Sequence, residues 1–157
     1  MADGGVRFRL AGELPREALM AMREGTTVDA CDARLSNAVA GASEWLVVVD
    51  GTRPEGWLLI EWNGKPSKPD HPDIADVFVR EGARGRGLGT LLVLEAERRV
   101  RERGHSRVGL SVNPEENVAA RRLYERLGYH HDGGEPYLDG VYDGVEDWVI
   151  DLVKDLG

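Results

Sequence analysis

The residues with the clearest chemical potential lie in the segment VFVREGARGRGLGTLL, which spans residues 77–92. It interleaves arginine and glycine, and the residues concerned are Arg84, Gly85, Arg86, Gly87 and Gly89. A β-like run precedes them and an apolar, helix-like run follows directly. A glycine-rich turn that leads into a helix presents free backbone N–H groups, and the helix dipole adds partial positive charge. This segment therefore predicts a binding site for an anionic group such as a phosphate.

Two common phosphate-binding loops do not fit the segment. A nucleoside-triphosphate loop needs Gly-Lys and then Ser or Thr at the helix start, whereas here Thr90 follows Gly89 with no lysine. A dinucleotide fingerprint reads G-x-G-x-x-G, whereas these glycines read G-x-G-x-G. The next strand, VGLSV, also ends in Asn113-Pro114 and not in an acidic residue. Both nucleotide classes are therefore disfavoured.

A second block, NVAARRLYERLGYH at residues 117–130, decides between the remaining phosphate ligands. Together with Arg84-x-x-Gly87-x-Gly89 it resembles the GNAT superfamily of acyl-CoA-dependent N-acyltransferases, in which R/Q-x-x-G-x-G/A grips the pyrophosphate of coenzyme A. The family pattern N-x-x-A-x-x-L-Y-x-x-L-G-F/Y is matched by Asn117, Ala120, Leu123, Tyr124, Leu127, Gly128 and Tyr129. The resemblance covers essentially the whole chain.

The resemblance implies an enzyme that uses acetyl-CoA as co-substrate and transfers the acetyl group to a primary amine by direct attack in a ternary complex. A non-catalytic acyl-CoA-binding sensor or interaction module on the same fold is the alternative. Tyr124 is expected to be the general acid, and the backbone of residues 77–79 to hold the pantetheine arm and polarise the thioester carbonyl. The residues expected to bind coenzyme A are Val77, Phe78, Val79, Arg84, Gly85, Arg86, Gly87, Leu88, Gly89, Thr90, Asn117 and Tyr124.

Several groups are candidates for the general base. Asp73 aligns with the catalytic carboxylate of some histone-type members, and Asp76 lies nearer the expected thioester. Glu61 and His71 also qualify, and the carboxylates rank Asp73, Asp76, Glu61. Because an exposed carboxyl has a pKa near 4, burial or a water relay must help it to deprotonate an ammonium.

These residues need a scaffold, and the hydrophobic pattern supplies one. Strands are expected at 6–10, 44–51, 56–62, 74–79, 107–112, 137–142 and 145–153, and helices at 15–22, 27–42, 87–103 and 117–127. Asp143-Gly144 predicts a tight hairpin turn. The resulting fold class is α+β, a GNAT-type mixed and mostly antiparallel sheet of six to seven strands with about four helices, in one domain over residues 1–157.

Composition limits the partners. The net charge of −8 disfavours nucleic acid, although residues 80–107 carry eight arginines against four glutamates. The single cysteine, Cys31, excludes a disulfide framework and a cysteine-based metal site, and it is a poor nucleophile candidate. No signal peptide or membrane span is expected, so the predicted location is the cytoplasm. The acidic C-terminal part is compatible with a cationic acceptor, either a small amine or a protein or peptide amine, and a homodimer is possible.

Overall fold

The computed structural model describes residues 5–66 and 68–157. The strands are β1 (Val6–Leu10), β2 (Ser43–Asp50), β3 (Arg53–Glu61), β4 (Asp73–Val79), β5 (Arg107–Val112), β6 (His130–His131), β7 (Tyr137–Tyr142) and β8 (Val145–Asp155). The α-helices are α1 (Arg16–Met22), α2 (Val28–Val39), α3 (Leu88–Glu102) and α4 (Val118–Arg126). Two short 3-10 helices, η1 (Ala11–Glu13) and η2 (Glu81–Ala83), precede α1 and α3.

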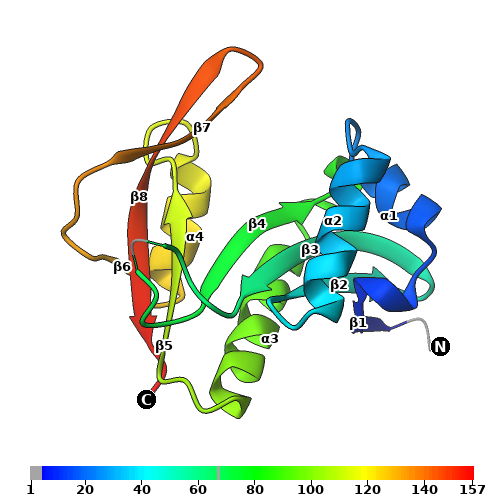
Figure 1. The fold of residues 1–157 in the computed structure, drawn as a ribbon, viewed down its shortest axis with the longest axis horizontal. Helices are drawn as coiled ribbons and strands as arrows, with labels where there is room; N and C mark the ends of the chain where they lie inside the picture. The colour runs from blue at the N-terminus through cyan, green and yellow to red at the C-terminus, as the bar shows by residue number, and fades with distance from the viewer. Residues whose placement is uncertain (1–4, 67) are drawn as a thin grey trace.

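The strands form one mixed sheet in the order β1-β2-β3-β4-β5-β8-β6, and β7 pairs with the first part of β8 (Figure 1). Only β4 and β5 run parallel; every other pair is antiparallel. The α+β class and the mostly antiparallel sheet are therefore confirmed. The strand beyond the predicted seven is β6, whose two residues are too short to produce a hydrophobic pattern.

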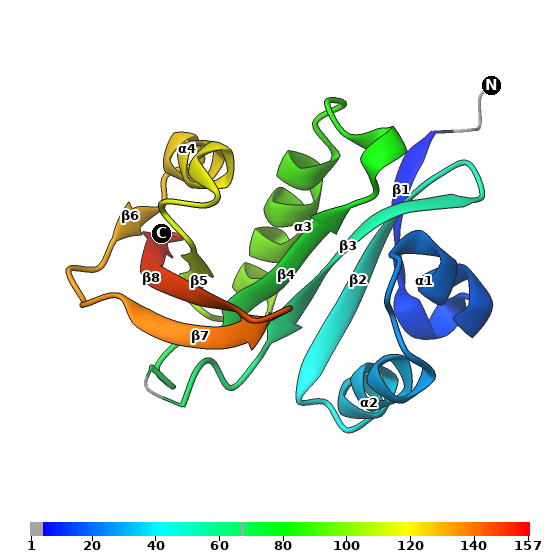
Figure 2. The same ribbon diagram turned by 90° about the horizontal axis from the view of Figure 1, so that it is seen from above.

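Helices cover both faces of the sheet, α1 and α2 on one side and α3 and α4 on the other (Figure 2). The first pair packs Leu19 and Cys31 against Trp45 and Trp57 of the sheet. The second pair packs the apolar stripe of α3 and part of α4 against the opposite face. No helix among the described residues is long and apolar enough to cross a membrane.

The sheet opens in its middle, between β4 and β5. These strands pair only at Asp73 with Gly109 and at Ile74 with Leu110, and then they diverge (Figure 1). A bulge lies just beyond this pairing, because the register of β4 against β3 shifts around Asp76, whose φ is +51°. A bulge bends a strand and increases its twist, so it accounts for the separation of β4 from β5.

Candidate active site

Two adjoining cavities fill the opening between β4 and β5, with volumes of about 480 and 680 Å³. They share the lining residues Ala75, Asp76, Val77, Ser111, Tyr124 and Asp139. The smaller cavity extends to Asp73, Lys65 and Tyr137, and the larger one to Asn117. The opening therefore brings together residues predicted from both sequence blocks.

The glycine loop joins the C-terminal end of β4 to α3, and neither Phe78, Val79 nor any residue from Arg84 to Thr90 lines either cavity. Gly85 and Gly87 have φ values of +82° and +75°, and Gly87 is the N-cap of α3. Among the described residues, no atom outside the adjoining backbone lies within 4 Å of the position that a Cβ would take on either glycine. Left-handed backbone and open space beside free helix N–H groups leave room for a bulky anion to approach the main chain.

The two arginines of the loop have different roles. Arg86 donates to Glu55 Oε2 at 2.9 Å and also pairs with Asp50, so two carboxylates of the sheet neutralise it. Arg84 donates from Nε to the carbonyl oxygen of Val79 at 2.9 Å, which ties the loop to the end of β4. Among the described residues no carboxylate pairs with Arg84. Of the two, Arg84 is the one whose charge is available to a pyrophosphate.

Tyr124 is placed by helix α4. Asn117 caps this helix by accepting a hydrogen bond from the N–H of Ala120 at 3.3 Å, and Tyr124 lies two turns further on. Its side chain packs edge-on against Tyr129, with ring centroids 6.2 Å apart. Burial raises the pKa of Tyr124 to about 12, so the phenol is neutral at physiological pH and able to donate a proton.

Asp73 lies at the start of β4 and is only 6% exposed. Burial raises the pKa of this carboxyl to about 6, and the ion pair with Lys65 opposes part of that rise. A carboxylate with such a pKa is a better base than an exposed one and is still mostly ionised at neutral pH.

Asp76 is held differently. Arg23 contacts both of its oxygens, at 2.8 and 2.9 Å, Arg34 contacts Oδ2 at 2.8 Å, and Trp57 Nε1 donates at 3.1 Å. Burial acts to raise the pKa of Asp76, but the two guanidiniums outweigh it and hold the pKa below the ordinary value. This geometry disfavours Asp76 as a base and suits it to organising the cavity wall.

The other base candidates lie outside the cavity walls. Glu61 is opposite Asp73 on β3, and burial raises the pKa of its carboxyl. The His71 ring lies against Gly109 on β5, with Nδ1 3.1 Å from the carbonyl oxygen of Pro72. Neither side chain lines either cavity. Cys31 is buried in the core, and burial raises the pKa of its thiol, which leaves less thiolate.

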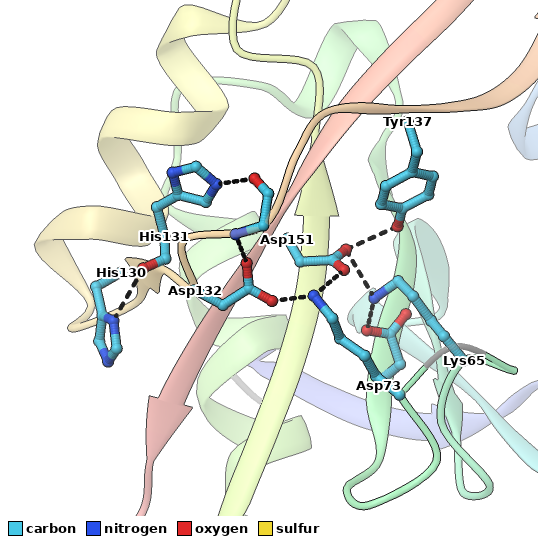
Figure 3. A network of polar contacts seen from close by, with 9 residues as sticks. Lys65, Asp73, His130, His131, Asp132, Tyr137 and Asp151 are labelled. Carbon is cyan, nitrogen blue, oxygen red and sulfur yellow. Dashed lines mark hydrogen bonds and ion pairs between the residues drawn. The ribbon is translucent and has the colours of Figure 1, made fainter.

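Sequence reasoning missed a polar network beside Asp73 (Figure 3). Asp151 of β8 accepts hydrogen bonds from Tyr137 at 2.7 Å and from Lys68 at 2.6 Å, and Lys65 Nζ lies 3.4 Å from its Oδ1. The sequence does contain one indication of this network, namely the carboxylate of Asp151 within the apolar run WVIDLV. A charge buried inside such a strand needs a partner, so it indicates a site nearby.

The model of the Acetyltransferase (GNAT) family matches residues 14–129. The chain belongs to this family.

Similar GNAT sequences include an uncharacterised N-acetyltransferase of Methanocaldococcus jannaschii, 33% identical over an alignment of 100 positions that covers 55% of this chain and 42% of that protein. A mycothiol acetyltransferase of Gordonia bronchialis is 38% identical over 97 residues, which are 62% of this chain and 30% of that protein. The chain matches less than half the length of these relatives.

Solved GNAT structures share the fold. A ribosomal-protein-alanine N-acetyltransferase from Brucella melitensis superposes with a TM-score of 0.79 at 21% identity, covering 96% of this chain and 99% of the other. A GNAT family acetyltransferase from Elizabethkingia anophelis, solved with acetyl-CoA bound, gives a TM-score of 0.64 at 15% identity, covering 99% and 100%.

Proposed function

We propose that the protein transfers the acetyl group of acetyl-CoA to a primary amine by direct attack within a ternary complex. The observation that carries the proposal is that one cavity is lined both by the raised-pKa carboxyl of Asp73 and by the neutral phenol of Tyr124. Acyl transfer from a thioester to an ammonium needs a base that deprotonates the ammonium and an acid that protonates the leaving sulfur, and the two groups need separate environments. Bound acetyl-CoA supplies the activated acetyl thioester.

The residues proposed to bind this co-substrate come from β4, the glycine loop and α4. The N–H groups from Gly85 to Thr90 and the guanidinium of Arg84 would hold the pyrophosphate, and Asn117, which lines the larger cavity, would contact the co-substrate from the start of α4. The diverging backbone of residues 77–79 would take the pantetheine arm as an added strand. A backbone N–H of the same segment would stabilise the oxyanion that develops on the thioester carbonyl.

Asp73 and Tyr124 then divide the proton transfers. Asp73 takes a proton from the acceptor ammonium, because only the neutral amine has a lone pair for attack. Tyr124 gives a proton to the departing sulfur, because its buried hydroxyl is a neutral acid. No covalent bond to the protein is needed.

The acceptor is proposed to be cationic. Asp139, Asp147 and Glu116 line the larger cavity, and their charges favour an ammonium over an anion. A mycothiol acetyltransferase and a ribosomal-protein-alanine N-acetyltransferase are among the similar proteins. Small amines and peptide N-termini are accordingly the two acceptor classes to compare.

The test is release of the coenzyme A thiol from acetyl-CoA over a panel of small amines, lysine peptides and peptide N-termini. We expect turnover with at least one class, and loss of turnover in Tyr124→Phe. Tight binding of acetyl-CoA without turnover on any amine would refute the enzyme and support a sensor module on the same fold.

A further inference from the structure

The Lys65 side chain reaches into the proposed active site from the loop between β3 and β4 (Figure 3). It is 16% exposed, forms an ion pair with Asp73 and lines the same cavity as Tyr124. The loop holds this position through Gly64, whose φ is +69° and whose Cβ position lies 2.4 Å from the His71 carbonyl oxygen. No larger residue fits there, so the backbone directs the next side chain inward.

Lys65 differs in this respect from the other lysines of the chain, which are Lys68 and Lys154. Lys68 pairs with Asp132 and Asp151 at the outer side of the network and lines neither cavity. Lys154 pairs with Glu97 at 2.8 Å beneath α3. Of the three lysines, Lys65 alone therefore combines a contact with the proposed base and a place in the cavity that contains the proposed acid.

We propose that Lys65 is a self-acetylation site, modified within its own chain by acetyl-CoA bound to the same protein. The inference rests on the proposed function, since Asp73 and Tyr124 act in both reactions. The Lys65 ammonium gives one proton to Asp73, and its nitrogen forms a bond to the thioester carbonyl carbon. The carbon–sulfur bond breaks, and the sulfur takes a proton from Tyr124. The second proton of the nitrogen restores the Tyr124 hydroxyl, and Asp73 releases its proton to solvent. The products are acetyl-lysine, coenzyme A and one net proton, with no oxidant or further reactant.

The primary test needs no variant. The purified protein is incubated with acetyl-CoA, digested and analysed by mass spectrometry for an added acetyl group on each lysine. We expect Lys65 to be modified at least about tenfold faster than Lys68 and Lys154, a ratio that corresponds to about 1.4 kcal/mol in barrier height. The fraction modified per unit time should not change with protein concentration, because the reaction occurs within one chain.

Three variants separate enzymatic from chemical acetylation. Lys65→Arg keeps the positive charge beside Asp73 and should abolish the acetylation at this position. Gly87→Glu, which should prevent acetyl-CoA binding, and Tyr124→Phe should each slow the labelling of Lys65. Equal labelling of all three lysines, or an unchanged rate in Gly87→Glu, would overturn the proposal.

The amine panel distinguishes this inference from the proposed function. Turnover of a panel amine with Lys65 left unmodified would overturn self-acetylation and leave the acetyltransferase activity standing. Acetyl-CoA binding with neither amine turnover nor modified Lys65 would overturn both. Modified Lys65 without turnover of any panel amine would support the inference and show that the catalytic groups function.

A second measurement tests the underlying contact without acetyl-CoA. The Lys65 charge opposes the rise of the Asp73 pKa, so Lys65→Gln, an uncharged mimic of acetyl-lysine, should move that pKa above about 6. Carboxyl carbon chemical shifts followed over a pH series report it directly. An unchanged titration of Asp73 would show that the two side chains do not interact in solution and would overturn the proposal.

Discussion

At the scale of single residues, burial raises the pKa of two side chains that line the smaller cavity. It raises the pKa of Asp73 to about 6 and that of Tyr124 to about 12. The carboxyl becomes a stronger base, and the phenol is kept protonated over the whole physiological range. Burial thus strengthens the Asp73 carboxylate as a base and keeps the Tyr124 hydroxyl in the protonated form that a proton donor needs.

Tyr124→Phe should lower kcat by about 10²- to 10⁴-fold, the usual contribution of a general acid. Acetyl-CoA affinity should change little, because the ring and its packing are retained. Steady-state thiol release and calorimetric binding measure the two quantities. Tyr129→Phe is the matched control, because this neighbouring tyrosine donates to buried Glu97 at 2.9 Å and lines neither cavity. Equal loss of kcat in both variants would contradict the role of Tyr124.

Activity should fall as the pH is lowered, because Asp73 then takes up a proton. Since its pKa is raised to about 6, the carboxylate form predominates above that pH and is lost below it. The pH profile of kcat/KM for the acceptor should therefore show an acidic limb with an apparent pKa near 6. Asp73→Asn should remove this limb and lower the plateau by about 10²-fold or more.

The control for this profile is Asp155→Asn, which alters an exposed carboxylate paired with Arg107. That variant should keep both the limb and the plateau. A limb near pH 6 that persists in Asp73→Asn would assign the titration to another group.

At the scale of elements, the N-terminus of α3 and its glycine loop form the proposed co-substrate site. Gly87→Glu places a side chain and a negative charge in the open space beside the helix N–H groups, and we expect acetyl-CoA binding to be abolished. Isothermal titration calorimetry is the direct measurement.

The other end of α3 provides the control. Gly104 follows the helix with φ of +91° and also has open space around its Cβ position. Gly104→Glu therefore carries similar backbone strain, about 1–2 kcal/mol, and the same charge, but it lies away from the loop. If both variants lost binding equally, general destabilisation would explain the result and the loop assignment would fail.

Local patterns explain which elements were predictable. Apolar periodicity and turn residues gave the strand and helix positions from Val6 to β8, including the Asp143-Gly144 hairpin turn, where both residues have positive φ. The bulge at Asp76 was not predictable, because it depends on the register between β3 and β4. Lys65 and Asp151 come together only because β8 pairs with β5, the strand next to β4. Periodicity contains no information on such a contact.

At the scale of the whole molecule, one buried charge cluster joins helix α3 to the second sequence block and to β8. Glu97 of α3, which is 1% exposed, accepts from Lys154 of β8 at 2.8 Å and from Tyr129 after α4 at 2.9 Å. The cluster fixes α3, α4 and β8 relative to one another. It therefore helps to fix the distance between the glycine loop, at the start of α3, and Tyr124 on α4.

Glu97→Ala should lower the free energy of unfolding by about 3 kcal/mol or more, because it leaves the Lys154 ammonium without its partner. Urea unfolding followed by circular dichroism measures the change. Glu102→Ala, which removes an exposed partner of Arg98 on the same helix, should have little effect. Similar stability of the two variants would show that the cluster does not hold the layers together.

Because β4 and β5 separate after two paired residues, the sheet has unpaired strand edges at its centre as well as at its two outer strands. Beyond Ile74, the N–H groups of β4 that face β5 have no ladder partner from that strand. Such amides should exchange with deuterium as fast as those of a rim strand, although core residues flank them above and below. A ligand that lies along β4 as an added strand would slow this exchange at the centre of the molecule and leave the true rims unchanged.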